Sequence, residues 1–347
     1  MKFRTFTVIC AMTLAMMSLS VQSFAKPTIT TFNAPGAGAN NQQGTAALSM
    51  NEAGTITGVI IDSHGLVHCF VRNPDDTIIK FDVPGAVVTV CYSINDKGEI
   101  TGFYTDQSGT QHGFKRDVDG DTTTIDVPNA EGTNGVSINN DGTIAGNYLN
   151  QQDEEQGFVR DGNANYTTFG APGARGTEVV PNGLNANGAT TGYKLYEQSA
   201  GQAWLRSPDG TDFPTFDVYG SLFTYAYGIN ADATVVGYSE DLSGVFHGYY
   251  RLQDDGTITQ FNDPNAGVAP GQGTQAYAIN KTLWITGAFA DPKNGIHGFV
   301  RSPKSVFTNF NIPGAISIYP AFINSAGVIA GYWQDKNGAY HGFVLIP

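Results

Sequence analysis

The sequence is poor in basic residues and in cysteine. It holds 18 Lys and Arg against 31 Asp and Glu, which gives a formal net charge of −13 at pH 7. This excess of negative charge opposes binding to phosphate backbones, so we expect no nucleic-acid partner. The chain has only three cysteines, too few for a disulfide scaffold. Packing and hydrogen bonds must therefore hold most of the fold together.

Long hydrophobic runs are also missing after the first 25 residues. No later segment approaches the roughly 18 apolar residues that span a bilayer, so we expect no membrane span. At the start of the chain, Lys2 and Arg4 precede a short apolar stretch, and Ser23 and Ala25 are small residues around a cleavage point. The sequence therefore predicts a secretory signal peptide (1–25) and a single domain (26–347), released as a monomer into the periplasm or medium of a bacterium.

One sequence motif recurs seven times along the chain. Its anchors lie 44, 44, 46, 45, 50 and 44 residues apart, at Asn51, Asn95, Asn139, Asn185, Asn230, Asn280 and Asn324. The second copy shows its four parts, which are VCYSIN (90–95), GEITGFYTD (98–106), QHGFKR (111–116) and TTTIDVP (122–128). Each part is short, β-branched or aromatic, and bounded by turn residues, which is typical of strands. The period lies in the range of propeller blades.

The segments that join these parts predict tight turns. Asn95 begins a hairpin in which its side chain caps the backbone and Gly98 accepts a positive φ, and Asp106 begins the next turn. No 10-residue segment after the leader has helical periodicity, so we predict an all-β protein. A recurrent glycine within the second strand, such as Gly102, indicates close approach by a neighbouring sheet.

The two ends of the domain favour a ring over an open array. The chain begins with a lone strand of the fourth type (28–35) and ends after a strand of the third type (341–345). Together these strands would complete one blade, and a closed ring leaves no long sheet edge open. The prediction is a seven-bladed β-propeller of four-stranded antiparallel blades, closed by the N-terminal strand.

Five of the six histidines occupy one position on the third strand. They are His68, His112, His247, His297 and His341, and Gln156 and Gln202 fill the position in the other two copies. Equivalent atoms of adjacent blades lie about 10 Å apart, whereas zinc needs nitrogen ligands at about 2.1 Å. We therefore predict structural hydrogen bonding at this position and no metal centre.

Asp117, Asp119 and Asp121 alternate as calcium ligands can, but Pro128 stands where a calcium loop would place a bidentate Glu. A polar hairpin tip is the favoured interpretation. No cofactor is expected, and a structural calcium ion stays open.

Cys69 and Cys91 are the two cysteines that follow the leader. Cys69 belongs to a third strand and Cys91 to a first strand, about two strand spacings apart in radial position. A disulfide needs Cα atoms within about 7 Å. The geometry therefore argues against a bond, and pairing in an oxidising compartment remains the alternative.

SINDKGEITGFYTDQSGTQHGF (93–114) resembles the HAF family of extracellular repeats. Copies in that family pair an Asn-x-x-Gly turn with an Ile-x-Gly strand and a closing His-Ala-Phe triplet or similar. The resemblance covers residues 28–347, with His-Gly-Phe in place of the namesake triplet. It implies a secreted repeat protein and supplies no catalytic residues.

A ring can vary its loops on one rim without altering its framework. The loops before the first strand and between the second and third strands should emerge on one face, and copies four, five and seven differ most there. The candidate ligand-binding residues are Arg175, Glu178, Lys194, Tyr196, Glu197, Phe223, Tyr225, Glu240 and Trp333.

Two functions fit this description. The favoured one is a secreted non-catalytic module that binds an extracellular carbohydrate or protein, because the sequence contains no recognisable catalytic motif. The alternative is a polysaccharide lyase or glycoside hydrolase at the propeller mouth, with Tyr196 as acid or base and Glu178, Glu197 or Glu240 as carboxylates. For anionic polymers, either Arg175 and Lys194 would have to create a basic mouth or calcium would have to bridge the ligand.

Overall fold

The computed structural model describes residues 27–170, 174–196 and 199–347, and all of their regular structure is β. The all-β prediction is confirmed within these ranges, and the predicted leader lies outside them. The described residues contain no helix that is long and apolar enough to cross a membrane.

The strands pair in consecutive groups of four, which we call units. Unit 1 is β2(Gly44–Met50), β3(Ile56–Ile61), β4(Val67–Arg72) and β5(Ile78–Phe81); unit 2 is β6(Val88–Ile94), β7(Ile100–Thr105), β8(Gln111–Arg116) and β9(Thr122–Thr124); unit 3 is β10(Gly132–Ile138), β11(Ile144–Leu149), β12(Glu155–Arg160) and β13(Tyr166–Phe169). Unit 4 is β14(Gly176–Leu184), β15(Thr190–Tyr196), β16(Ser199–Arg206) and β17(Thr215–Phe216); unit 5 is β18(Ser221–Ile229), β19(Val235–Asp241), β20(Phe246–Arg251) and β21(Ile258–Phe261). Unit 6 is β22(Gly273–Ile279), β23(Ile285–Ala290), β24(Ile296–Arg301) and β25(Phe307–Phe310); unit 7 is β26(Ala315–Ile323), β27(Ile329–Asp335), β28(Tyr340–Ile346) and β1(Thr28–Phe32).

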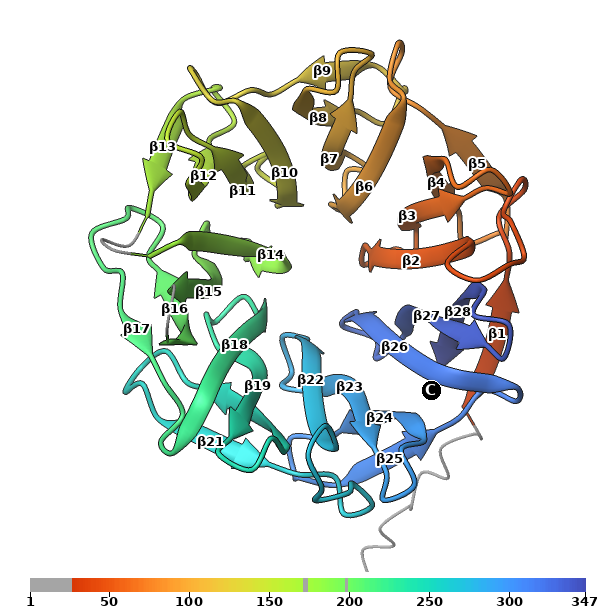
Figure 1. The fold of residues 1–347 in the computed structure, drawn as a ribbon, viewed down its shortest axis with the longest axis vertical. Coiled ribbons are helices and arrows are strands. Elements are labelled where there is room, and N and C mark those ends of the chain that lie inside the picture. The colour runs from red at the N-terminus through yellow and green to blue at the C-terminus, as the bar shows by residue number, and fades with distance from the viewer. Residues whose placement is uncertain (1–26, 171–173, 197–198) are drawn as a thin grey trace, which may run out of the picture.

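The units lie side by side around a common centre, with the first strand of each unit innermost (Figure 1). Neighbouring strands within a unit are antiparallel, as β6, β7, β8 and β9 are in unit 2. In unit 7, β1 pairs with β28 from Thr28 opposite Ile346 to Phe32 opposite Gly342. The start of the domain therefore supplies the fourth strand of the sheet that contains its end.

The turn asparagines connect each unit to the next. Each amide nitrogen donates to a backbone carbonyl of the following unit: Asn51 to Asn95, Asn95 to Asn139, Asn139 to Asn185, Asn185 to Asn230, Asn230 to Asn280, Asn280 to Asn324, and Asn324 to Glu52. The last bond returns to unit 1, at a distance of 3.4 Å.

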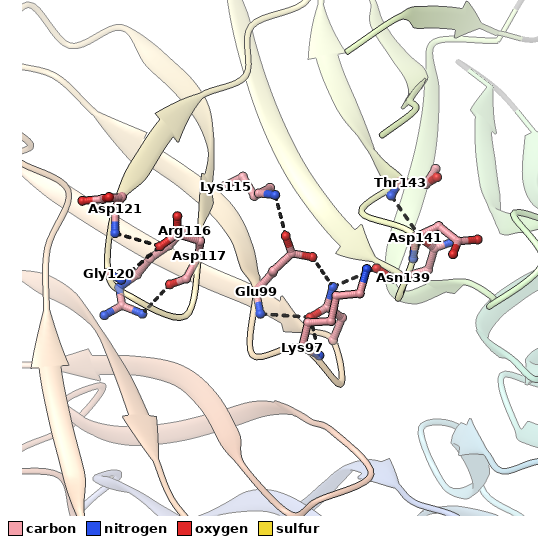
Figure 2. Close-up of polar contacts among 11 residues, drawn as sticks. Lys97, Glu99, Lys115, Arg116, Asp117, Gly120, Asp121, Asn139, Asp141 and Thr143 are labelled. Carbon is pink, nitrogen blue, oxygen red and sulfur yellow. Dashed lines mark hydrogen bonds and ion pairs between the residues drawn. The ribbon is translucent and has the colours of Figure 1, made fainter. Parts of the chain in front are cut away.

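The same asparagines cap their own turns, as the sequence predicted. In Figure 2, Asn139 accepts hydrogen bonds from the backbone N–H groups of Asp141 and Thr143, at 3.0 and 3.1 Å. Gly142 in this turn has φ +75°. Each asparagine side chain is almost fully buried, so its hydrogen bonds are shielded from competition with water.

The recurrent glycines of the second strands have a different cause from the one predicted. A β-carbon at Gly102 or Gly146 would overlap the carbonyl oxygen of Val90 or Asn134, on the first strand of the same unit. At Gly146 it would also lie 2.8 Å from the Phe158 ring. Each first strand has a register shift beside this position, as between Cys91 and Ser93, and the shift turns a carbonyl toward the glycine. The close approach therefore comes from within the unit, not from a neighbouring sheet.

The hydrophobic core lies between adjacent units. One buried cluster joins Cys69 and Val83 of unit 1 to Cys91, Ile100 and Phe114 of unit 2. In this cluster Cys69 and Cys91 form a disulfide, with Cα atoms 5.6 Å apart. The expectation of unpaired cysteines was wrong because adjacent sheets stack face to face with an offset. The third strand of one unit thereby faces the first strand of the next.

Candidate functional site

The first and second strands of units 4 to 7 carry a group of neighbouring tyrosines. We call it the tyrosine arc, which comprises Tyr193, Tyr225, Tyr227, Tyr238, Tyr277, Tyr319 and Tyr332. Four of these residues lie on the innermost strands β18, β22 and β26, and the other three lie on the second strands β15, β19 and β27. All seven side chains are partly exposed.

The rings of the arc contact one another across strands and units. Tyr193 of unit 4 meets Tyr225 of unit 5 edge to face, with ring centroids 5.1 Å apart. Tyr227 stacks on Tyr238 at 5.2 Å and reaches Tyr277 of unit 6 at 5.7 Å. In unit 7, Tyr319 and Tyr332 stack at 4.9 Å. Such packing fixes the orientation of the rings and preorganises their exposed faces.

The hydroxyls of Tyr193, Tyr238 and Tyr332 remain protonated near neutral pH. Burial raises the pKa of Tyr193, and the neighbouring Glu178 carboxyl raises it further. Burial also raises the pKa of Tyr238 and of Tyr332, and in each case nearby tyrosines add to the shift. The arc therefore offers neutral hydroxyls and aromatic faces.

A pair of carboxyl groups adjoins one end of the arc. Glu178, on β14, lies directly opposite Tyr193 on β15 and hydrogen-bonds to the side chain of Glu155 on β12. Burial, followed by this contact and the charge of Glu155, raises the pKa of Glu178 to about 8. The amide of Asn147 holds Glu178 in place, with its Nδ2 atom 3.2 Å from Oε2. We call Glu155 and Glu178 the acid pair; at neutral pH Glu178 keeps its proton, beside the carboxyl of Glu155.

Near the asparagine turns, a cavity of about 510 Å³ lies at the centre of the ring, lined by residues of all the units. One wall comes from a bulge in β14, where Val179 to Leu184 lies opposite only Gly192 to Thr190. From this bulge, Asn182 donates across the centre to the carbonyl of Ala321 in unit 7, at 2.8 Å. Unit 4 therefore extends into the space that the other units surround.

The structure places the predicted ligand-binding residues in several surroundings. Glu178 belongs to the acid pair and Tyr225 to the arc, and Phe223 stacks on Tyr225 at 5.9 Å. Glu240, on β19, lies opposite Phe223. Burial raises the pKa of Tyr225, and the charge of Glu240 raises it further. Arg175 is exposed just before β14. These positions bring part of the predicted set together at the junction of units 4 and 5.

The remaining predicted residues lie apart from that junction or cannot be placed. Lys194 is only 6% exposed, with its ammonium 5.1 Å from the centre of the Phe213 ring, so little of it can meet a ligand. Its burial leaves little of Lys194 for the basic mouth that an anionic polymer would require. Trp333 stacks on His341 at 4.3 Å. The side chain of Tyr196 and the whole of Glu197 lie outside the described residues.

Sequence reasoning missed Glu155 and every tyrosine of the arc except Tyr225. It searched the loops, whereas these residues lie on strands. A usable signal was present, because the residue after the recurrent second-strand glycine is Tyr193, Tyr238 or Tyr332 in three copies. Alternation along a strand places that residue on the opposite face from the constrained glycine, where side chains can vary.

The repeated histidines hold local structure, as predicted. Nδ1 of His112 lies 2.8 Å from Asp126, which follows the fourth strand, and Nε2 lies 3.6 Å from Asp106 in the preceding turn. His297 repeats the arrangement with Asn311 at 2.6 Å and Asp291 at 3.1 Å. Each imidazole therefore bridges a turn to the segment that leaves its unit.

The acidic turns are likewise occupied by local hydrogen bonds. Oδ1 of Asp106 accepts from the backbone of Ser108 and Thr110, and hydrogen bonds from these two residues lower its pKa. Asp117 accepts from Gly120 and Asp121 in the same way (Figure 2). Among the described residues, no three His, Cys, Asp or Glu side chains are grouped so that they could hold a metal ion.

No protein-family model and no curated protein sequence matches the chain. Solved structures do resemble it. The β-propeller domain of the Trilobed protease from Pyrococcus furiosus, which has an open Velcro topology, gives a TM-score of 0.59 at 9% identity, over 86% of this chain and 95% of that one. An acylaminoacyl peptidase from Pyrococcus horikoshii gives 0.54 at 10% identity, over 84% of this chain and 49% of that one.

A lectin from Burkholderia pseudomallei gives a TM-score of 0.54 at 8% identity, over 86% of this chain and 94% of that one. The chain thus spans nearly the whole of the lectin and about half of the peptidase. At such low identities these likenesses bear on the fold alone. They agree with the strand order and pairing described above, and the fold is a β-propeller.

Proposed function

We propose that this protein is a secreted, non-catalytic binding module for an extracellular carbohydrate or protein, and that its ligand binds at the tyrosine arc. The scaffold in this proposal is a seven-bladed propeller closed by the N-terminal strand. The pairing of β1 with β28 supports closure, as does the chain of asparagine hydrogen bonds that returns to Glu52.

The arc is the single observation that carries the binding function. Seven tyrosines converge from four consecutive units, keep part of each ring exposed, and hold one another in place. Tyrosine contributes a large apolar face and a hydroxyl with only two side-chain torsions to fix, which is why it is enriched in binding sites. A scaffold with no ligand would gain more from burying these rings fully.

Export is part of the proposal and has two supports. The resemblance of residues 93–114 to HAF repeats favours an extracellular protein. The Cys69–Cys91 disulfide is the kind of bond that persists in oxidising compartments. Measuring the protein in culture medium and periplasm, with and without residues 1–25, tests this part.

A polysaccharide lyase or glycoside hydrolase remains the second candidate, and one observation favours it. Glu178 keeps a proton near neutral pH, as a general acid must. The contact between Glu178 and Glu155 speaks against it, because the two carboxyls of a glycosidase stand about 5 to 10 Å apart around the substrate. Binding without turnover therefore fits the geometry better.

The deciding experiment compares binding and turnover in one set of variants. Purified protein is screened against neutral and charged glycans and secreted proteins, and the same mixtures are assayed for reducing ends and unsaturated products. The test variant is Tyr225→Ala with Tyr319→Ala, and the matched control is Tyr219→Ala, a fully exposed tyrosine outside the arc. We expect saturable binding that the double variant loses and the control keeps. Turnover that Glu178→Gln abolishes would replace the binding module with the enzyme.

A further inference from the structure

The acid pair borders a cavity that is rich in hydrogen-bond acceptors. This cavity, of about 440 Å³, lies between units 2 and 3 and is lined by Glu155, Glu131, Asn134, Asn147 and the turn around Gly109. The Oδ1 atom of Asn134 is buried and has no hydrogen-bond partner among the described residues. A buried acceptor without a donor costs stability, so a donor supplied by a ligand would be favourable there.

The charge around this cavity has one sign. Among the described residues that line it, two are carboxylates and none is basic. The groups that face Glu178 are Glu155, Asn147, Tyr193 and Tyr92, and burial followed by the two carboxyls raises the pKa of Tyr92. Both tyrosines are neutral near pH 7, and within the described parts of the chain no cationic side chain contacts Glu178.

An equivalent cavity shows that the scaffold does not impose this character. It lies between units 6 and 7, also has a volume of about 440 Å³, and is lined by Lys293, Ile296, Ile312, Ile316 and Ile318 among others. Asn294, His297 and Asn311 also line it, but none of its lining residues is a carboxylate. The two carboxylates are a property of the cavity between units 2 and 3 and not of the repeat.

We propose that the cavity between units 2 and 3 and the adjoining acid pair bind a guanidinium group, presented by an arginine side chain of a protein ligand whose neighbouring residues pack on the tyrosine arc. A guanidinium carries five N–H donors in a planar fork, which suits two carboxyls and a lone amide oxygen. Its flat faces also stack on aromatic rings. This inference rests on the proposed binding function and names the ligand chemistry.

Binding of the cation is coupled to a proton. The free pair keeps one proton on Glu178 below a pKa of about 8, and an approaching guanidinium favours the form in which both carboxyls are ionised. Glu178 then releases its proton to solvent, and both carboxylates accept hydrogen bonds from the ligand. Linkage requires the affinity to rise with pH, by up to about tenfold per pH unit between pH 6 and 8, and to level off above that.

The test uses the blocked peptide acetyl-Gly-Arg-Gly-amide and the same peptide with citrulline, which has the shape of arginine but no charge. Titration calorimetry at pH 6, 7, 8 and 9, in buffers of different ionisation enthalpy, measures affinity and proton release together. We expect the arginine peptide to bind at least tenfold more tightly than the citrulline peptide and to release up to one proton below pH 8. Agmatine in a parallel arm distinguishes a peptide ligand from a small guanidinium compound.

The variants are Glu155→Gln and Glu178→Gln, with Glu154→Gln as the matched control. Glu154 is adjacent in the chain but exposed and bonded to Asn150. Binding should be lost in Glu155→Gln, should become independent of pH in Glu178→Gln, and should be unchanged in the control, with melting curves showing that all three are folded. Equal binding of the citrulline peptide, displacement by calcium chloride, or full binding by Glu155→Gln would each overturn the inference. One further outcome separates the two proposals. If a neutral saccharide binds, and this binding is lost in the Tyr225→Ala/Tyr319→Ala variant but kept in Glu155→Gln, the proposed function stands and the guanidinium ligand is rejected.

Discussion

The asparagine turns and the strand residues above them follow opposite rules. All seven asparagines donate to the next unit along the chain of hydrogen bonds. The facing pairs on the first two strands vary, and only the Tyr–Tyr pair occurs twice: Ala46 and Val59, Val90 and Phe103, Asn134 and Asn147, Glu178 and Tyr193, Tyr225 and Tyr238, Gln275 and Ala288, and Tyr319 and Tyr332. A contact that connects units must be repeated, whereas a side chain outside those contacts can change alone. Function is therefore best sought where the repeat is broken.

Removing the N-terminal strand should have the largest effect on the repeated part. Deletion of residues 26–35 removes β1, leaves the edge of β28 unpaired and takes Ala34 from a buried cluster. We expect the melting temperature to fall on the order of 10 °C or more, or the protein to associate through the open edge. Removal of residues 1–25 alone is the control. A deletion protein that stays monomeric with unchanged melting would count against ring closure.

Replacing a single turn asparagine should reduce stability more than replacing an asparagine of the facing pairs on the first two strands. Asn139→Ala removes a buried hydrogen bond to Asn185 and two partly buried hydrogen bonds from Asp141 and Thr143, each worth about 1 kcal/mol. Urea unfolding should show a loss of about 2 to 4 kcal/mol. The matched control is Asn134→Ala. The side-chain oxygen of Asn134 is buried and has no hydrogen-bond partner among the described residues, so this substitution should reduce the free energy of unfolding by less. Equal losses would erase the distinction between the two regions.

Loss of the disulfide should have the next largest effect on stability. It closes a loop with a sequence separation of 22 residues, which predicts a stabilisation of about 3 kcal/mol. Unfolding of the wild type with and without reductant measures this difference without leaving a cavity. The Cys69→Ala/Cys91→Ala protein should not respond to reductant. A wild type that is equally insensitive would mean that the bond contributes nothing to folding.

The fold could be predicted from the sequence because its signals are local and repeated. Asn139 with Gly142 specifies a turn, and short β-branched segments specify strands, so strand order followed from the period. The disulfide could not be predicted in this way, since it depends on how two sheets are offset when they stack. That offset arises from packing between units, about which the turn and strand signals of a single copy carry no information.

The site could be predicted only in part, for a related reason. Glu178 and Tyr225 were predicted from loop variation, but Tyr193 and Glu155 come next to them only through pairing and contact between units 3, 4 and 5. The bulge that carries Asn182 appears in the sequence merely as a spacing of 46 residues in place of 44. Its contact with Ala321, 139 residues away, depends on how units 4 and 7 lie relative to each other.

The acid pair predicts an effect that develops as the pH rises from about 4.5, the ordinary pKa of a Glu carboxyl, to about 8. The pKa of Glu178 is raised in the folded protein to about 8, so folding favours its protonated form. Stability from this group is present below its unfolded pKa and is lost as pH rises through about 8. Glu178→Gln should therefore melt at a higher temperature than the wild type at pH 9 and at nearly the same temperature at pH 5. A difference of equal size at both pH values, or the same pattern in Glu154→Gln, would contradict this.

The smallest effect should come from the repeated histidines, because the scaffold already accepts glutamine in their position. Gln202 donates to Asp217 at 2.6 Å, in place of the histidine contact with the residue after the fourth strand. Burial lowers the pKa of His112, but hydrogen bonds and charges from Asp126 and Asp106 outweigh it and raise the pKa overall. Its extra stability is thus present below the unfolded pKa of about 6.5 and is lost as pH rises through the folded value. His112→Gln should cost about 1 kcal/mol or less at pH 5.5, with a smaller difference at pH 8.5, and should leave ligand binding unchanged. Loss of binding in this variant, or stoichiometric zinc held by several of the histidines, would give the repeated position a functional role and remove the contrast between the two regions.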